Sequence, residues 1–512
     1  MHAVAGLMAT TATPFKMSRI GRHGLVYAAG IMLSRVVGLV MLPVYTRYLT
    51  PAGYGVLQLI QMVLEVASIA AGSRLGAGIF RFYHKAETAE ERQALLSTAL
   101  ILLLTTYGVA TGVMYALAPG IAQATLGGVQ NTTLVRIAAL GMACDGLLLV
   151  PVAYLRLLDR STVYVTIMTG KLLLQVALNV LFVVHLGLGA KGVVMSTLIV
   201  NGLTGTGLAA YLVKQIGVRF SGRAARDLLR FGVPFVWTQV ATFILTFGDR
   251  YFLGRVSDVG AVGLYGLAYT FGFLLAMIGE VPFSMVWEPA RFEIARRADR
   301  DELYARGFIY FNLVVLTGAV CITLFVGDLL RVMAAPAFLP ARDLVPIILI
   351  AYLLQSWSSM HDIGIQVRER TEFQTLANWI GAIVALAGYA LLIPRLFGLG
   401  AAIATAASFA VREWAVYRFS QRLWPVHYRW GPVMRVLLVA VATCLVGIAL
   451  PPLPLWASVA VRLLLLVGYA GVLWHIGVLS IDDRLAIRRL VRNRGQLLIV
   501  LRQRLQPESV TK

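Results

Sequence analysis

The feature that most constrains this chain is a series of long apolar segments, each about as long as a bilayer-crossing helix. Only 13% of the 512 residues are charged and the mean hydropathy is +0.78, whereas soluble domains carry roughly 25% charged residues. A bilayer core of about 30 Å needs roughly 20 apolar helical residues. The runs are continuous and do not alternate, so the sequence predicts an all-α integral membrane protein.

About fourteen transmembrane helices are expected, joined by short loops. Their predicted bounds are 24–46, 53–79, 95–118, 132–156, 162–185, 190–213, 230–255, 260–286, 306–330, 343–366, 374–394, 399–419, 433–451 and 457–478.

Basic residues are unevenly distributed between the two sides of the predicted membrane. The net charge is +21. With the N-terminus inside, the inner loops hold most Lys and Arg, whereas outer loops 119–131 and 451–456 hold none. This positive-inside pattern predicts a multi-pass protein of the cell inner (cytoplasmic) membrane with both termini in the cytoplasm. Because the charges are spread over all inner loops and form no single patch, we expect no nucleic-acid partner.

The two ends of the chain differ from the segments between them. Residues 1–23 lack a short apolar core with a small-residue cleavage site, so no cleavable signal peptide is predicted. The tail from Ser480 mixes Arg with Leu, Ile and Val, and Ser480 and Asp483 have capping-box spacing. This composition predicts a basic amphipathic helix on anionic lipid.

Two stretches about 200 residues apart resemble each other. "TRYLTPAGYGVLQL" at 46–59 and "DRYFLGRVSDVGAVGLYGLAYT" at 249–270 both read Arg-Tyr, a turn, then Tyr-Gly and an apolar helix. Arg-Phe recurs one helix later in each case, at Arg81 and Arg291. Chance recurrence is the alternative, but three matches at nearly one offset favour a repeat. The copies enter the membrane from the same side, as in transporters built from parallel repeats.

The repeat predicts two six-helix lobes followed by two further helices. The expected divisions are a cytoplasmic segment 1–23, an N-lobe 24–213, an inter-lobe linker 214–229, a C-lobe 230–419, a helix pair 433–478 and a basic tail 479–512.

Polar residues inside the predicted spans fall on single helix faces. The stripes are Gln58-Gln61-Glu65-Ser68, Lys171-Gln175-Asn179, Thr238-Thr242-Thr246-Asp249 and Gln355-Ser359-Asp362-Gln366, and Arg35, Asp145, Glu280, Arg412 and Glu413 are isolated charges. Uncharged polar residues are most simply helix–helix contacts. An unpaired charge at the bilayer centre costs at least about 2.5–3.5 kcal/mol, so the charges must pair or line water. Arg35 could pair with Glu65 on the adjacent span.

Several classes of chemistry lack the residues they need. The sequence has no GxxxxGK[ST] loop and no extramembrane stretch long enough for a catalytic domain. Cys144, Cys321 and Cys444 lie in apolar runs, without CxxC or Cys/His clusters. We therefore expect no enzyme activity, no disulfide, no metal and no cofactor.

One region of the sequence resembles a known family. "SRVVGLVMLPVYTRYLTPAGYGVLQL" followed by "GSRLGAGIFRFYH" is similar to the start of Wzx-type polysaccharide-biosynthesis flippases. These belong to the multidrug/oligosaccharidyl-lipid/polysaccharide exporter superfamily. The matching positions are Arg47, Leu49, Pro51, Tyr54 and Gly55 at the first turn, then Arg81, Phe82 and Tyr83.

The resemblance implies alternating-access transfer of an undecaprenyl-diphosphate-linked oligosaccharide from the inner to the outer leaflet. The carried glycan would serve O-antigen, capsule or exopolysaccharide assembly, with a polymerase and glycosyltransferases as partners. It also implies a cationic cavity. Candidate substrate-binding residues are Arg35, Lys171, Arg250, Arg412, Gln58, Gln61, Thr242 and Gln355, and candidate ion-coupling residues are Glu65, Asp249 and Glu280.

Two alternatives remain open. An ion-coupled multidrug or cation antiporter of the same fold should have a cavity dominated by acids, whereas basic residues are at least as numerous within these spans. A membrane enzyme or scaffold without transport is disfavoured by the polar stripes.

Overall fold

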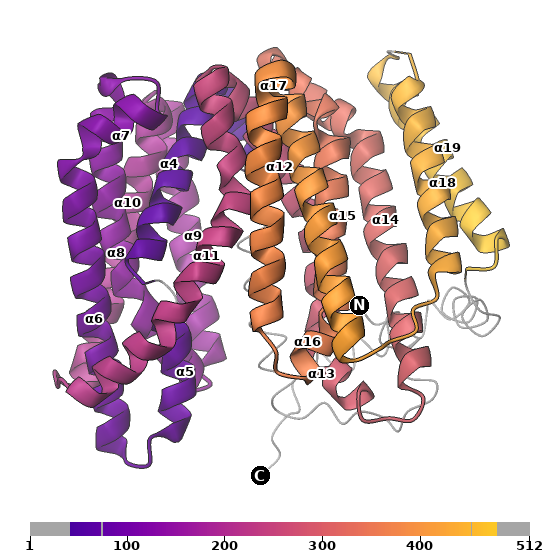
Figure 1. Cartoon of the computed structure of the whole chain (residues 1–512). Helices are drawn as coiled ribbons and strands as arrows, with labels where there is room; N and C mark the ends of the chain where they lie inside the picture. Colours follow the sequence, from indigo (N-terminus) through magenta and orange to yellow (C-terminus); the bar gives the residue numbers. More distant parts are fainter. Residues whose placement is uncertain (1–40, 73–74, 452, 479–512) are drawn as a thin grey trace, which may run out of the picture.

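The computed structural model describes residues 41–72, 75–451 and 453–478, which form a helical bundle without a strand (Figure 1). The helices are α3 Leu42–Tyr48, α4 Pro51–Ala70, α5 Leu75–Lys85, α6 Ala89–Ala116, α7 Ala118–Thr125, α8 Thr132–Leu157, α9 Ser161–Asn179, α10 Gly189–Ile216, α11 Gly222–Val256, α12 Val259–Leu275, α13 Val281–Ile294, α14 Arg300–Met333, α15 Val345–His361, α16 Ile363–Val367, α17 Glu372–Leu423, α18 Trp430–Ala449 and α19 Leu455–His475. Short π-helices occupy Val180–His185 (η3) and Ala276–Glu280 (η4), and 3-10 helices occupy Val129–Asn131 (η2) and Pro336–Asp343 (η5).

The protein is an all-helical, multi-pass membrane protein. The described residues contain eleven helices long and apolar enough to cross a bilayer, or twelve if the bent pair Pro336–Asp343 and Val345–Val367 is one span. Segment 1–23, most of predicted span 24–46 with Arg35, and tail 479–512 lie outside the described residues. The second predicted span, 53–79, differs in its end, because α4 stops at Ala70 and α5 is a separate helix.

Helix α17 contains two antiparallel arms. Its 52 residues would measure about 78 Å as one rod, far more than a bilayer core. The backbone breaks at Phe397, where φ is 49° and ψ is −126°. Arg412 Nε donates to Asn378 Oδ1 at 2.7 Å, so the arms fold back on each other. They correspond to predicted spans 374–394 and 399–419.

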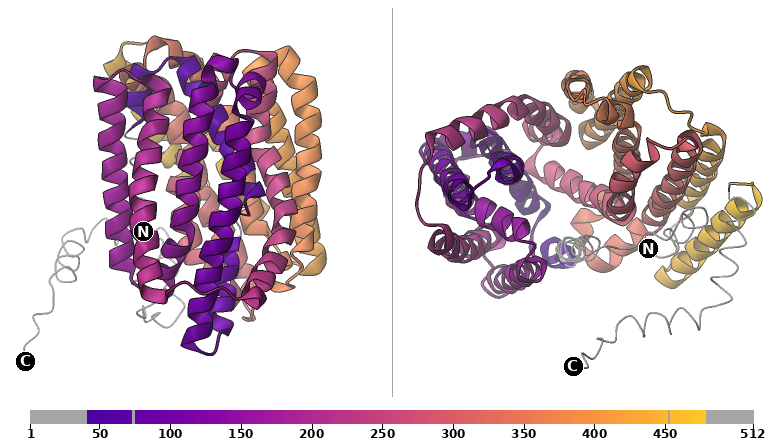
Figure 2. Two further views of the ribbon diagram at one scale, coloured as in Figure 1. Left: turned by 90° about the vertical axis from the view of Figure 1, so that its left-hand side faces the viewer. Right: turned by 90° about the horizontal axis from the view of Figure 1, so that it is seen from below.

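The helices pack as two groups. In the first group α8 packs against α6 and α10, and in the second α17 packs against α11 and α15. Helices α4 and α12 contact each other and join the two groups. Helices α18 and α19 pack on α14, at the edge of the bundle away from the first group (Figures 1 and 2).

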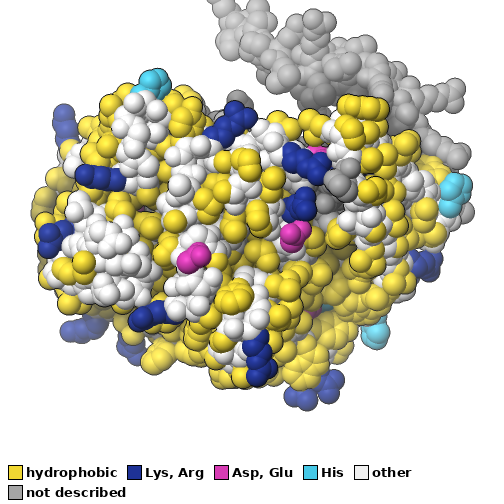
Figure 3. All heavy atoms as spheres, turned by 90° about the horizontal axis from the view of Figure 1, so that it is seen from above, with side chains coloured by type: hydrophobic (Ala, Val, Ile, Leu, Met, Phe, Trp, Pro, Cys, Tyr) yellow, Lys and Arg dark blue, Asp and Glu magenta, His cyan; other side chains and the backbone are white. Residues whose placement is uncertain are grey.

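The joining helices start at the same end of the bundle, the upper end in Figure 1, and each start has a side-chain cap. Thr50 Oγ1 accepts from Gly53 N at 3.0 Å, and Pro51 follows in the first turn. Asp258 Oδ1 accepts from Ala261 N at 2.7 Å. Such caps satisfy amide groups that a helix start leaves free. Figure 3 looks onto this end, where apolar side chains with scattered Lys and Arg cover the described helices.

Just inside these caps, α4 and α12 cross in close contact. A Cβ added to Gly55 would lie 1.9 Å from the Val259 carbonyl oxygen, and one added to Gly263 would lie 2.0 Å from that of Pro51. The contact is reciprocal, and it pairs Gly55 with Gly263. Only glycine allows such close backbone approach.

Candidate functional site

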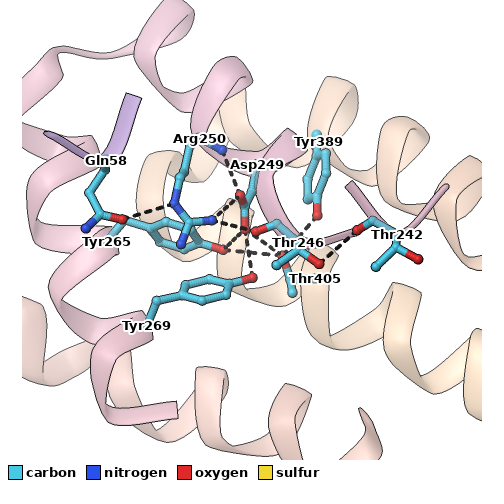
Figure 4. Close-up of polar contacts among 9 residues, drawn as sticks. All are labelled: Gln58, Thr242, Thr246, Asp249, Arg250, Tyr265, Tyr269, Tyr389 and Thr405. Carbon is cyan, nitrogen blue, oxygen red and sulfur yellow. Dashed lines mark hydrogen bonds and ion pairs between the residues drawn. The ribbon is translucent and has the colours of Figure 1, made fainter. Parts of the chain in front are cut away.

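Asp249, on α11, has no exposed surface and is surrounded by donors from three helices. Its Oδ2 accepts hydrogen bonds from the hydroxyls of Tyr265, at 2.7 Å, and Tyr269, at 2.8 Å (Figure 4). Thr405 of α17 adds a longer bond of 3.4 Å. Its Oδ1 lies 3.1 Å from Nη1 of Arg250. The carboxylate is therefore fixed and neutralised within the protein.

Arg250 is 4% exposed and bridges the two groups of helices. Its Nη1 donates to the Thr246 carbonyl at 2.6 Å, and its Nε donates to Gln58 Oε1 on α4 at 3.3 Å (Figure 4). The guanidinium also lies 4.4 Å from the centre of the Tyr269 ring. A diphosphate could reach Arg250 only after some of these partners move.

The sequence patterns selected Asp249, Arg250 and Gln58 but missed the tyrosines. Tyr265 and Tyr269 are one turn apart, so both hydroxyls lie on one face of α12. A buried tyrosine hydroxyl usually finds a hydrogen-bond partner. Two tyrosines four residues apart in an apolar helix are therefore a signal that could have identified them.

A second polar cluster lies in the same group of helices. Glu280 ends the π-helix η4 and accepts hydrogen bonds from Ser356 Oγ at 2.7 Å and Ser359 Oγ at 3.2 Å. π-Helical turns often occur at functional sites. Arg412 interacts electrostatically with Glu280, although its hydrogen bond goes to Asn378.

A buried ion pair and a buried histidine–glutamate contact adjoin this cluster. Arg291, 5% exposed, contacts Asp362 at 2.9 Å and Glu288 at 2.7 Å. His361 contacts Glu413 at 2.5 Å. The sequence patterns noted Asp362 and Glu413 as intramembrane charges, but they did not identify His361, which ends its helix next to Asp362.

The first group of helices presents its charges differently. Asp145 lies at the middle of α8 and is exposed. Asn201 Nδ2 donates to its Oδ1 at 2.6 Å. Lys171 of α9 is partly buried and interacts electrostatically with Asp145, but no ion pair within 4.0 Å forms between them. A charged carboxylate at this depth is costly against lipid, so we expect the surroundings of Asp145 and Lys171 to be hydrated.

Glu65, on α4, approaches the same region. Glu65 is partly buried and interacts electrostatically with Tyr107. Tyr107 also interacts electrostatically with Asp145. Tyr107 Oη lies 3.1 Å from Ser68 Oγ. Glu65 forms no ion pair with a described residue, and its predicted partner Arg35 lies outside the described part of the chain.

The remaining predicted polar residues are dispersed. Gln61 and Thr242 are exposed, and Thr242 Oγ1 donates to the Thr238 carbonyl at 2.8 Å. Gln355 is partly buried on α15. The structure thus brings together Gln58, Asp249 and Arg250, brings Glu280 near Arg412, and keeps Lys171 apart from both sets. Among the described residues, no group of three or more His, Cys, Asp and Glu side chains could hold a metal ion.

Comparison with known proteins identifies the family. The family model described as "Polysaccharide biosynthesis protein" matches residues 20–295, more than half of the chain. The chain belongs to the polysaccharide biosynthesis protein family. A comparison with curated protein sequences finds no match.

Solved structures show the fold of this polysaccharide biosynthesis protein. Lipid II flippase MurJ in an inward closed conformation superposes with a TM-score of 0.70 at 12% identity, over 88% of this chain and 99% of that chain. An inward-facing multidrug resistance MATE family transporter of the MOP superfamily gives 0.60 at 16% identity, over 82% and 97%. The multidrug transporter DinF-BH in complex with R6G gives 0.56 at 17% identity, over 78% and 94%.

These matches show that this family member has the fold shared by MurJ and the MATE transporters. One of the matched structures is a flippase and the other two are transporters.

Proposed function

We propose that this protein is a flippase that moves an undecaprenyl-diphosphate-linked oligosaccharide across the cytoplasmic membrane by alternating access. The glycan would serve O-antigen, capsule or exopolysaccharide assembly. Membership of the polysaccharide biosynthesis family and the fold shared with a lipid II flippase support this proposal.

The observation that carries the proposal is the intramembrane position of Lys171 beside an exposed Asp145. Charges at this depth require a hydrated cavity. Lys171 has no ion-pair partner within 4.0 Å among the described residues, so its ammonium can meet a diphosphate without breaking a buried contact. Exposed Gln61 and partly buried Glu65, on α4, would supply hydrogen bonds to sugar hydroxyls or a site for a coupling ion.

The close crossing of α4 and α12 would form the closed outer gate of this transporter. Gly55 and Gly263 bring the two helices into backbone contact, and Arg250 joins them deeper through Gln58. In the outward-facing state, separation of α4 from α12 would break the hydrogen bond between Arg250 and Gln58. Arg250 and Arg412 would then be later contacts for the diphosphate, after Lys171.

The same proposal includes the full topology. The two arms of α17, the bent pair formed by η5 with α15 and α16, and predicted span 24–46 bring the count to fourteen helices. They would form two six-helix lobes, 24–213 and 230–419, with 433–478 as an extra pair and both termini in the cytoplasm.

Replacement of Lys171 tests the proposed function. K171A should abolish surface glycan and accumulate lipid-linked precursor in the inner leaflet, whereas K171R should retain export because it keeps the positive charge. Lys191→Ala is the matched control, because Lys191 is exposed at the start of α10. Export is measured by surface glycan, precursor by lipid extraction, and folding by membrane abundance.

Normal surface glycan in K171A would remove Lys171 from the site. The alternative function, an ion-coupled multidrug or cation antiporter, makes the opposite prediction for loss of the whole protein. Unchanged glycan with increased sensitivity to cationic drugs would favour that alternative over the flippase.

A further inference from the structure

A histidine–glutamate pair lies buried between α15 and α17, away from the proposed Lys171 site. His361 is 1% exposed and Glu413 is 7% exposed. The imidazole Nδ1 lies 2.5 Å from the carboxylate Oε1. The other two polar atoms, His361 Nε2 and Glu413 Oε2, are buried and have no hydrogen-bond partner in the part of the chain that the structure describes. Buried polar atoms without partners are uncommon, and they often mark a functional group.

Aromatic rings enclose this pair. The centre of the imidazole lies 4.6 Å from the Tyr428 ring, 4.7 Å from Phe308, 5.1 Å from Tyr417 and 5.6 Å from Trp430. These rings come from α14, α17, the segment before α18 and the start of α18. They separate the pair from solvent on several sides.

From this geometry we infer that His361 and Glu413 form a proton-binding site, which holds one exchangeable proton while the ring enclosure is closed. With that proton the pair has no net charge, whether it is written as imidazolium and carboxylate or as imidazole and carboxylic acid. If Nε2 of the imidazolium passes its proton to water, a neutral imidazole whose Nδ1–H still faces the carboxylate remains, and the pair carries one negative charge. A buried charge without a partner is costly. Release of the proton therefore requires water to enter.

The neighbouring charged groups strengthen this argument. Those that face the pair or its partners, with the nearby phenols, are Glu280, Glu288, Arg291, Tyr304, Asp362, Arg412, Tyr417 and Tyr428. With Glu413 they contain four carboxylates and two arginines. Arg291 is already paired with Asp362 and Glu288, and Arg412 interacts with three of the carboxylates. Acidic groups therefore outnumber basic ones around the pair, so loss of its proton would add a further negative charge to an acidic surrounding.

The position of the pair connects proton binding to helix movement. His361 ends α15, and the next residue, Asp362, is bound to Arg291 of α13. Glu413 lies on α17. One wall of the enclosure is the segment between α17 and α18, which carries Tyr428. Movement of that segment would admit water to Nε2. This coupling to transport rests on the proposed flippase function, whereas proton binding itself does not.

Tryptophan fluorescence tests proton binding without any substrate. Trp430 lies beside His361, and a protonated imidazole quenches a neighbouring indole. The purified full chain in detergent should therefore show a step in emission between about pH 5 and pH 9. Because the chain has nine tryptophans, the informative quantity is the difference between the wild type and each variant. H361Q should lose the step, and E413Q should move it to lower pH because the carboxylate counter-charge is gone.

His427 provides a matched control. It forms a histidine–carboxylate pair with Asp301 at 3.0 Å, but its side chain is 85% exposed. H427Q should keep the wild-type step. The exchange variant H361E/E413H keeps both groups and should regain a step, which would show that H361Q lost the step with the pair and not through misfolding. A wild type without a step, a step that persists in H361Q, or a step lost in H427Q would overturn the proton site.

Export measurements then test coupling separately. In cells that depend on this protein, wild-type glycan export should vary between about pH 6 and pH 8, and H361Q should give a flat profile. Suppose that the wild type shows the fluorescence step and H361Q loses it, but H361Q exports glycan with the wild-type pH profile. That result would refute coupling to transport and leave the proton site intact. Failure of the flippase function would leave the fluorescence result unaffected.

Discussion

The two groups of helices use their intramembrane charges in different ways. Every ion pair within 4.0 Å in the described part of the chain involves residues from Asp249 onward. In the first group, Asp145 and Lys171 stay beyond that distance from any opposite charge among the described residues, and Asp145 is exposed. A paired, buried charge fixes helices to each other, whereas an unpaired one beside water is available to a ligand. We therefore expect ligand contact in the first group, and charge pairing that holds helices together in the second.

Replacement of Asp249 should have the largest effect and tests the comparison directly. D249A would leave Arg250 buried without its counter-charge and would remove the acceptor of two tyrosine hydroxyls. Removal of one partner from a buried ion pair costs about 3–5 kcal/mol. We expect a large fall in the unfolding temperature in detergent and little protein in the membrane.

Asp145→Ala is the counterpart in the first group. Asp145 accepts one hydrogen bond, from Asn201, and a typical net contribution of such a bond is about 0.5–1.5 kcal/mol. D145A should therefore fold nearly normally while export falls. Equal losses of stability in D249A and D145A would contradict the division between the two groups.

The sequence predicted the helices better than the contacts between them. Long apolar runs define bilayer-spanning helices through composition alone, and capping residues such as Thr50 mark where a helix begins. The break at Phe397 lies in the short joint between the two predicted spans of α17, residues 395–398, which contains Arg395 and Gly398. The early end of α4 was not anticipated, because the predicted span continued through the small residues Ala71, Gly72 and Ser73 and past Arg74 to residue 79.

Which side chains meet across two helices depends on how each helix is rotated about its axis, and the local sequence of a helix does not specify that rotation. His361 and Glu413 are 52 positions apart, and Gln58 and Arg250 are 192 apart. The polar stripe placed Asp249 within a predicted span, and the residue lies buried on α11, a helix long and apolar enough to cross a bilayer. Its role as an internal counter-charge depends on Tyr265 and Tyr269 from another helix. Its proposed part in ion coupling stays a prediction, and so does that of Glu280.

The crossing of α4 and α12 is where the two groups meet, and its disturbance should have the next largest effect. In G55A the new methyl group would lie 1.9 Å from the Val259 carbonyl oxygen, so the helices must move apart. Overpacking of this kind costs about 1–3 kcal/mol. We expect reduced export with moderate destabilisation, measured by surface glycan and thermal unfolding.

Gly112→Ala is the control for this substitution. Gly112 lies on α6, where an added Cβ meets nothing within 4 Å, so the variant should resemble the wild type. G263A should reproduce the G55A result because the contact is reciprocal. If G263A were neutral while G55A was defective, the two glycines would not form a single gate.

Removal of the contacts that attach α19 to α14 should have the smallest effect, and it tests how the second group of helices is held together. Asp328 on α14 is 4% exposed and accepts hydrogen bonds from Ser458 Oγ at 3.0 and 2.8 Å and from Arg462. Arg331 lies 3.6 Å from the same carboxylate.

In R462A, Ser458 and Arg331 would still satisfy Asp328, so the unfolding free energy should fall by only about 1 kcal/mol. In D328A the guanidinium of Arg462 would lose its carboxylate partner while still partly buried, so thermal unfolding should reveal a clearly larger loss. A larger loss in R462A than in D328A would mean that Arg462 stabilises α19 by contacts other than Asp328, and the paired charges of the second group would then not account for how its outermost helix is held.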